Sequence, residues 1–358
     1  MRQAVQTAVA ACLAYATSEL LQMPQGFWAV VTAIMVMQAN VGASLGQAID
    51  RLLGSLLGVL VGGVFALLLA DAHLLRYAGL AAAVLLLAYF SGRRPALRVA
   101  CVTAAIVILG DPRFGTTLSS AGNRIVEVLI GAVIASLTSL ILFPSRAGPS
   151  LATHVRQSLP LFFELLGAGV GAAISGRYDE HAVSLLATKV REAISRTNTL
   201  AAQTRTEIAG HLADYPDPEA VVRTLRRLWH TEIMLLRAVA APLPETARVR
   251  LRAPLQRLAD TVAGLSVRYP DAAAELPDLT PLQDELQAVE VELGRLREDG
   301  GLRALPMDDM ARLMAFDFAL SQLRANIKDL ADRNSDLAGF TGSSLPWLRN
   351  LRRRIAGA

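Results

Sequence analysis

The sequence predicts an all-α membrane protein: six transmembrane helices forming a 3+3 inverted repeat, followed by a cytoplasmic helical bundle. Three observations predict this class. Hydrophobic residues make up 53% of the chain and the mean hydropathy is +0.39, both high for a soluble globular protein. Six apolar segments precede Pro144, and the later ones partly repeat the earlier ones. The whole net charge of +4 lies in the same region, because residues 150–358 carry equal numbers of basic and acidic side chains.

The predicted spans differ in length. They cover residues 3–22, 24–41, 48–70, 74–91, 96–110 and 121–143, which together form a transmembrane domain over residues 1–146. The apolar parts of the third and sixth spans are about 19 residues long, roughly 28 Å as a helix, and can cross the hydrocarbon core of a bilayer. The apolar parts of the second and fifth spans are shorter, so these helices need polar flanks or a break to cross.

The internal repeat predicts how the spans are arranged. Residues 48–69 match residues 121–142, and residues 29–33 match residues 100–104, at nearly the same offset along the chain. Each repeat contains three spans, so the second repeat runs through the membrane in the opposite direction. The short second and fifth spans then occupy equivalent places, which is typical of a substrate path near the middle of the bilayer.

The distribution of arginine predicts that both termini are cytoplasmic. With the N-terminus inside, the inner side of the membrane carries Arg2, Arg51, Arg93, Arg94, Arg98 and Arg146, whereas the outer side carries Arg76, Arg113 and Arg124. An excess of basic residues marks the cytoplasmic side.

Residues 147–358 are predicted to form a cytoplasmic all-helical domain. Apolar residues recur at helical spacing over residues 179–213, 218–241, 282–298 and 307–333. Such helices commonly pack as an antiparallel bundle. Residues 159–174 are also apolar, and Pro160 and Glu164 favour a buried or interfacial helix there over a seventh span.

Two arginines interrupt the apolar spans at equivalent places in the repeat. Arg51 aligns with Arg124 when the two repeats are compared, and each lies about two turns inside a long helix. An arginine near hydrocarbon is costly and commonly pairs with an acid or lines a wet cavity. Because the repeats are antiparallel, one arginine would lie near each membrane face, where positive charge selects anions. The alternative is that both are anchors whose side chains reach the membrane interface.

Two acidic residues lie in the predicted spans. Glu127 follows Arg124 by three residues and shares its helix face, and Glu19 lies near the end of the first span. Each is interpreted either as the structural partner of a nearby charge or as a proton-coupling carboxylate.

The two short spans carry further candidates for the substrate path. Phe27 and Trp28 open the second span and fit either an aromatic belt at the interface or a surface on which an aromatic solute stacks. Thr32 and Thr103 match across the repeat and either bond their own backbone or contact the solute.

Glycines at the spacing of close helix packing lie in the long third and sixth spans. Gly54, Gly58 and Gly62 recur every four residues, and Gly131 is the equivalent of Gly58. Small residues at this spacing let helix backbones approach each other, so we predict a packing role for all four.

The sequence offers no motif for catalysis, for a cofactor or for a metal. It contains no phosphate loop, nucleophile elbow or HExxH pattern. The five histidines never stand three or four residues apart, and Cys12 and Cys101 are isolated. No soluble segment carries an excess of positive charge, which argues against a nucleic-acid partner. We therefore expect a protein that is not an enzyme, has no cofactor and has the lipid bilayer as its environment.

The first 146 residues resemble the fusaric acid resistance and aromatic acid exporter family. The resemblance rests on residues 26–63, where an aromatic pair, a threonine, a polar loop and an Arg-x-x-Gly-Ser-x-x-Gly sequence follow one another, and on residues 123–144, which end in Phe-Pro. The residues at the family positions are Phe27, Trp28, Thr32, Gln38, Gly42, Arg51, Gly54, Ser55 and Gly58. Plant aluminium-activated malate transporters share this layout of six spans and cytoplasmic helices.

The resemblance implies a transporter of the bacterial inner membrane that exports aromatic carboxylic acids or related small organic anions. Large bacterial members carry the membrane-plus-tail unit twice and this chain carries it once, which implies a homodimer. The chain departs from the family pattern at Glu127, where a small or hydroxyl residue is common. A passive anion channel, and a membrane scaffold or sensor that transports nothing, are the alternatives.

Overall fold

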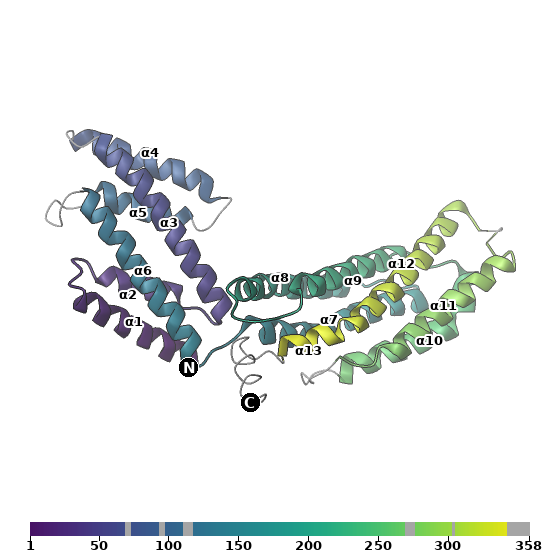
Figure 1. The fold of residues 1–358 in the computed structure, drawn as a ribbon. Coiled ribbons are helices and arrows are strands. Elements are labelled where there is room, and N and C mark those ends of the chain that lie inside the picture. Colours follow the sequence, from purple (N-terminus) through teal and green to yellow (C-terminus); the bar gives the residue numbers. More distant parts are fainter. Residues whose placement is uncertain (69–72, 93–96, 110–116, 269–275, 303–304, 342–358) are drawn as a thin grey trace, which may run out of the picture. The chain divides into compact units, whose positions relative to one another are not determined.

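The computed structural model describes residues 1–68, 73–92, 97–109, 117–268, 276–302 and 305–341 (Figure 1). Every regular element within these residues is a helix, so the predicted all-α class is confirmed. The chain forms two compact units, residues 1–147 and residues 148–358. Each unit is described by itself below.

Unit 1 contains six helices in its described residues. They are α1 (Arg2–Leu20), α2 (Phe27–Val36), α3 (Val41–Leu68), α4 (His73–Ser91), α5 (Leu97–Ile108) and α6 (Thr117–Ile141). Each corresponds to one predicted span, but their lengths differ from prediction. The second span holds only the ten residues of α2, and α3 begins seven residues before the predicted residue 48.

The early start of α3 has a local cause at Asn40. Its side-chain oxygen accepts a hydrogen bond from the backbone N–H of Ala43 at 2.8 Å. Asparagine is a favoured residue just before a helix because it satisfies one of the unpaired N–H groups of the first turn. The hydroxyl of Ser44 in turn accepts the N–H of Gln38 at 2.9 Å, which fixes the connection from α2.

The surface of unit 1 is apolar and its interior holds polar groups. Large apolar side chains of α3 and α6 point outward and are exposed, including Leu60 at 63%. Arg51, Ser55 and Arg124 are buried in the same two helices. This distribution is the reverse of that in a soluble protein, where an exposed apolar surface of this kind is rare. It is the arrangement expected of helices whose outer faces contact lipid.

The interior of unit 1 is packed mainly with small side chains. One cluster of buried apolar residues is dominated by alanines from α1, α2, α3 and α6, namely Ala10, Ala14, Ala29, Ala33, Ala48, Ala132 and Ala135. Without a hydrophobic driving force in lipid, close packing of small residues is a main source of helix association.

The two halves of unit 1 make equivalent helix contacts. α3 packs on α5, and α6 packs on α2. A Cβ added at Gly58 of α3 would lie 2.6 Å from the Cβ of Thr103, and a Cβ added at Gly131 of α6 would lie 2.7 Å from the Cβ of Thr32. These four residues are the pairs that the sequence repeat aligns, so each half packs its long helix on the short helix of the other half.

α3 and α6 pack against each other and run in opposite directions. The backbone N–H of Val41, the first residue of α3, donates to the carbonyl of Ser145, just after the end of α6. The side-chain amide of Gln6, near the start of α1, donates to the carbonyl of Leu142. The beginnings of α1 and α3 and the end of α6 therefore lie on the same side of unit 1.

Three of the described helices are long and apolar enough to cross a membrane by length and composition alone. They are α3, the Ala121–Ile141 part of α6, and α7 (Ala147–Ser175). Of these, α7 lies in the core of unit 2: Leu159, Phe162 and Leu166 are buried there, and a Cβ added at Gly169 would lie 3.4 Å from the side chain of Leu236 in α9. The ambiguous residues 159–174 therefore belong to a buried helix in this structure.

Unit 2 is a helical bundle with one large apolar core. After α7 it contains α8 (Glu180–Ala209), α9 (Pro218–Ala238), α10 (Glu245–Arg268), α11 (Thr280–Glu298), α12 (Met307–Asp332) and α13 (Asn334–Thr341). The sequence pattern predicts no helix at α10, which contains Pro254 in its interior. Aspartates cap α8 and α9: Asp179 accepts the N–H of Ala182, and Asp217 accepts that of Glu219.

Candidate functional site

The candidate site lies inside unit 1 and is built around two arginines. Arg51 of α3 is 4% exposed and Arg124 of α6 is 3% exposed. The two side chains interact electrostatically, as do those of Arg124 and Glu127. The two arginines therefore influence each other inside unit 1, and the interpretation that one arginine lies near each membrane face stays a prediction.

The buried guanidinium groups are incompletely satisfied. Within the described part of the chain, Nε of Arg51 and both Nε and Nη1 of Arg124 have no hydrogen-bond partner. Burying a charged donor without a partner costs several kcal/mol in general, so proteins rarely leave one unpaired. Two such groups in one interior form a site that an anion could complete.

An aromatic side chain forms one wall of the site. The guanidinium carbon of Arg124 lies 3.7 Å from the centre of the Trp28 ring, in the first turn of α2. The Phe27 ring centre is 4.9 Å from that of Trp28, and the Phe27 side chain is exposed on the surface of unit 1. Trp28 therefore faces the arginine inside, while Phe27 is placed where lipid contact is expected.

Glu127 is buried beside Arg124 but bonds to a different group. Its Oε1 accepts the backbone N–H of Gln25 at 3.2 Å, two residues before α2 begins. Glu127 thus ties the start of α2 to α6. Glu19, the other predicted acidic candidate, is exposed near the end of α1, where it is hydrogen-bonded to Tyr15. The structure does not bring Glu19 to the arginines.

Three buried hydroxyl groups lie on the same helices. Thr32 of α2, Thr103 of α5 and Ser55 of α3 have no hydrogen-bond partner in the described residues. Hydroxyl groups without a backbone partner are free to donate to a solute. Ser55 was not among the predicted site residues, and its signal in the sequence is its place one turn after Arg51 on the same helix face.

The positions of the arginines also change the count that predicted the orientation. Arg51 and Arg124 were counted at the inner and outer side, respectively, yet both lie inside helices. Leaving both out removes one arginine from the inner count and one from the outer count, so the predicted excess of arginine on the inner side remains. Arg93, Arg94 and Arg113 lie outside the described residues.

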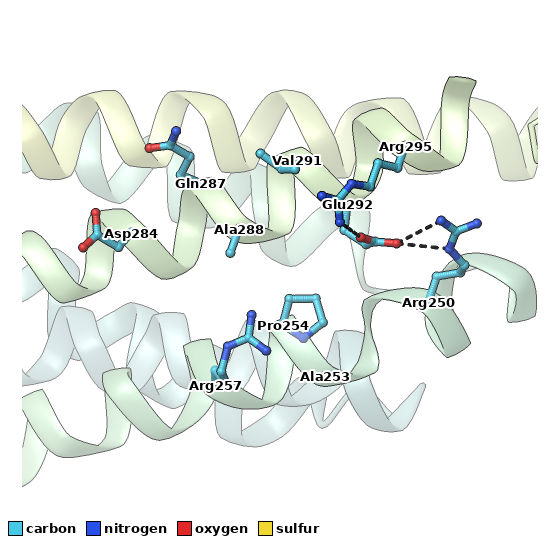
Figure 2. Close-up of a pocket in the computed structure, with 10 residues that line it drawn as sticks. All are labelled: Arg250, Ala253, Pro254, Arg257, Asp284, Gln287, Ala288, Val291, Glu292 and Arg295. Carbon is cyan, nitrogen blue, oxygen red and sulfur yellow. Dashed lines mark hydrogen bonds and ion pairs between the residues drawn. The ribbon is translucent and has the colours of Figure 1, made fainter. Parts of the chain in front are cut away.

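A pocket in unit 2 shows the contrasting case of arginines that are already paired (Figure 2). It has a volume of about 680 Å³ and lies between α10 and α11. Arg250 and Arg295 both bind the Glu292 carboxylate, at 3.0 Å and 3.1 Å. Arg250 also pairs with Asp299 at 2.8 Å, so two carboxylates balance the two arginines. Because these charges are paired and the side chains are partly exposed, the pocket does not need an anion as the buried arginines of unit 1 do.

The comparison with known families agrees with the resemblance found in the sequence. Residues 13–138 match the family described as fusaric acid resistance protein-like. The match begins in α1, ends in α6 and includes all the site residues named above. No curated protein matches the chain. The resemblance to the plant malate transporters stays a prediction.

That family is one of membrane transporters, not of enzymes. Residues 13–138, which lie within unit 1, are therefore similar to the fusaric acid resistance protein-like family, and this similarity indicates a role in membrane transport or efflux.

Proposed function

We propose that this protein exports aromatic carboxylic acids or related organic anions across the bacterial inner membrane, and that it works as a homodimer. The observation that carries the proposal is the pair of buried, incompletely bonded guanidinium groups of Arg51 and Arg124. The proposal assigns six membrane spans to unit 1, with both termini and unit 2 in the cytoplasm.

The chemistry of the two arginines favours a carboxylate as the solute. A carboxylate accepts two parallel N–H bonds from one guanidinium, and hydrogen bonds between charged groups are the strong ones. The solute would also neutralise charge that the protein otherwise buries uncompensated. An aromatic solute fits because Trp28 lies against Arg124 and offers a ring face for stacking.

The helix contacts support the inverted repeat. α3 and α6 are antiparallel, and the Gly58–Thr103 contact of one half has its counterpart in the Gly131–Thr32 contact of the other. In a 3+3 inverted repeat the two short helices, α2 and α5, would border the solute near the middle of the bilayer.

The test is efflux of benzenesulfonate from proteoliposomes containing the full chain. A charge-assisted hydrogen bond contributes about 1.5–3 kcal/mol, so Arg51→Met and Arg124→Met should each slow efflux at least about tenfold. Arg98→Met is the matched control, because Arg98 is an exposed arginine of the same unit. Equal efflux in all three variants would refute the proposed role of the buried arginines.

Stability separates a transport role from a structural one. If Arg51 has no partner until a solute binds, replacing it with an apolar side chain removes a buried uncompensated charge. Arg51→Met should then be at least as resistant to heat as the wild type.

An anion channel would differ from a coupled exporter by passing a current that depends on voltage and does not depend on a pH gradient. Cross-linking in the membrane tests the homodimer.

A further inference from the structure

Glu127 is the one acidic residue that is buried among the described residues of unit 1, with 1% of its surface exposed. It stands three residues after Arg124 on the same helix face, and the two side chains interact electrostatically. No mechanism of anion binding needs a carboxylate here, because a negative charge beside the arginines opposes the entry of an anion. Its presence at this position calls for a function of its own.

The charges of the site depend on the state of this carboxylate. With Glu127 ionised, the two arginines and the carboxylate carry one net positive charge. With Glu127 protonated, they carry two, and Arg124 has no competing anion beside it. In a low-dielectric interior, one additional positive charge next to the site strongly raises its affinity for an anion.

We propose that Glu127 competes with the transported anion for Arg124, so that binding of each anion is linked to the uptake of one proton by Glu127. The inference rests on the proposed function. The proton comes from water on the side that the site faces and adds to a carboxylate oxygen, and no other bond forms or breaks. It returns to water when the anion leaves, so anion and proton cross the membrane together, and export is driven by an outward anion gradient that exceeds the inward proton gradient.

The hydrogen bond to Gln25 couples the same event to α2. An ionised carboxylate accepts the Gln25 N–H at 3.2 Å more strongly than a neutral carboxyl does. Protonation therefore weakens the connection between α6 and the start of α2, where Trp28 lies. The proton would change both the charge of the site and the hold on its aromatic wall.

No other buried acid or base competes for this role on the described residues of the helices that pack on α6. Those helices are α1, α2, α3 and α5. Apart from Arg51, their titratable side chains are exposed (Arg2, Cys12, Tyr15, Glu19, Asp50 and Arg98) or, for Cys101, partly buried. On α6 itself, Arg124 faces Glu127.

The experiment is calorimetric titration of the full chain in lipid nanodiscs with benzenesulfonate, which stays ionised across the range of pH used. Titrations at pH 5.5 and pH 7.5, in buffers of different ionisation enthalpy, give the affinity and the number of protons taken up. The wild type should bind about tenfold or more tightly at the lower pH, with a proton uptake near one in the range where affinity changes.

Variants assign the proton to Glu127. Glu127→Gln should bind with similar affinity at both pH values and take up no proton, while Glu127→Asp should restore the dependence on pH. Asp50→Asn, which removes an exposed carboxylate beside Arg51, should behave as the wild type. A neutral Glu127→Gln variant that keeps the wild-type dependence on pH would overturn the proposal.

The outcomes also separate this inference from the proposed function. Binding that is lost in Arg51→Met but takes up no proton in the wild type overturns the coupling and leaves the anion site standing. Absence of benzenesulfonate binding by the wild type at both pH values overturns both.

Discussion

The guanidinium of Arg124 lies 3.7 Å from the centre of the Trp28 ring, which joins the start of α2 to α6 inside unit 1. A cation over a tryptophan face is attracted by the negative centre of the ring. The contact holds Arg124 in place without satisfying Nε or Nη1, which remain available to an anion.

Replacing Trp28 should weaken anion binding through the loss of this support. A cation–π contact contributes about 0.5–2 kcal/mol, so Trp28→Leu should bind benzenesulfonate about 2- to 30-fold more weakly, and Trp28→Phe should lose less. Trp229→Phe serves as the control, because Trp229 faces Arg191 in unit 2. Wild-type affinity of Trp28→Leu in a direct binding assay would contradict this prediction.

The two glycine contacts should be equally sensitive to substitution. A methyl group at Gly58 or Gly131 would overlap the backbone and threonine of the opposite helix, so Gly58→Ala and Gly131→Ala should each lose about 1–3 kcal/mol of stability. Gly63→Ala meets no atom within 4 Å and should be neutral or slightly stabilising. Thermal unfolding in detergent measures the three variants, and a tolerant Gly131→Ala would argue against equivalent packing in the two halves.

Glu232 of α9 should make unit 2 less stable as pH rises. Burial raises the pKa of Glu232 well above its ordinary value. Below about pH 4.3 the carboxyl is neutral in both the folded and the unfolded chain. Above it the unfolded chain ionises first, so stability falls by at most about 1.4 kcal/mol per pH unit until the folded carboxyl ionises too.

The variant Glu232→Gln removes that dependence. Its hydrogen-exchange protection in α9 should exceed that of the wild type by a margin that grows from pH 5 to pH 8. Glu192→Gln, an exposed change on α8, should show no such margin. An equal margin at every pH would mean that ionisation of Glu232 is not the cause.

Asp329 should stabilise the contact between α9 and α12 at neutral pH and lose this effect in acid. Burial would raise the pKa of Asp329, but hydrogen bonds from Thr224 and Arg333 and the charge of Arg227 outweigh it and lower the pKa. Its contribution is therefore present above about pH 3.9 and disappears as pH falls through the lowered value.

Thermal unfolding of a variant without the Asp329 charge tests this contribution to stability. Asp329→Asn should cost about 1–3 kcal/mol at pH 7, because the neutral amide loses the charge that pairs with Arg227 and, at 3.2 Å, with Arg333. The exposed Asp332→Asn is the control. A cost for Asp329→Asn that persists unchanged at pH 3 would contradict the prediction.

The sequence by itself determined the all-α class, and its internal matches predict the repeat. Apolar runs and helical spacing act along one chain segment, so they can be read without knowing any neighbour. A local pattern could not predict α10, because Pro254 breaks the hydrogen bonds of the segment. The segment is helical because Leu251, Leu255 and Leu258 are buried in the core, which is a tertiary effect.

Only the tertiary structure decided which side chains meet. In a segment that is apolar on every face, the pattern does not tell the face toward lipid from the face toward other helices. The packing of α2 on α6 placed Trp28 over Arg124 and Gln25 on Glu127, and the burial of α7 placed an apolar segment of spanning length in unit 2. The physical reason is that such contacts depend on helix direction and crossing, which join residues about a hundred positions apart.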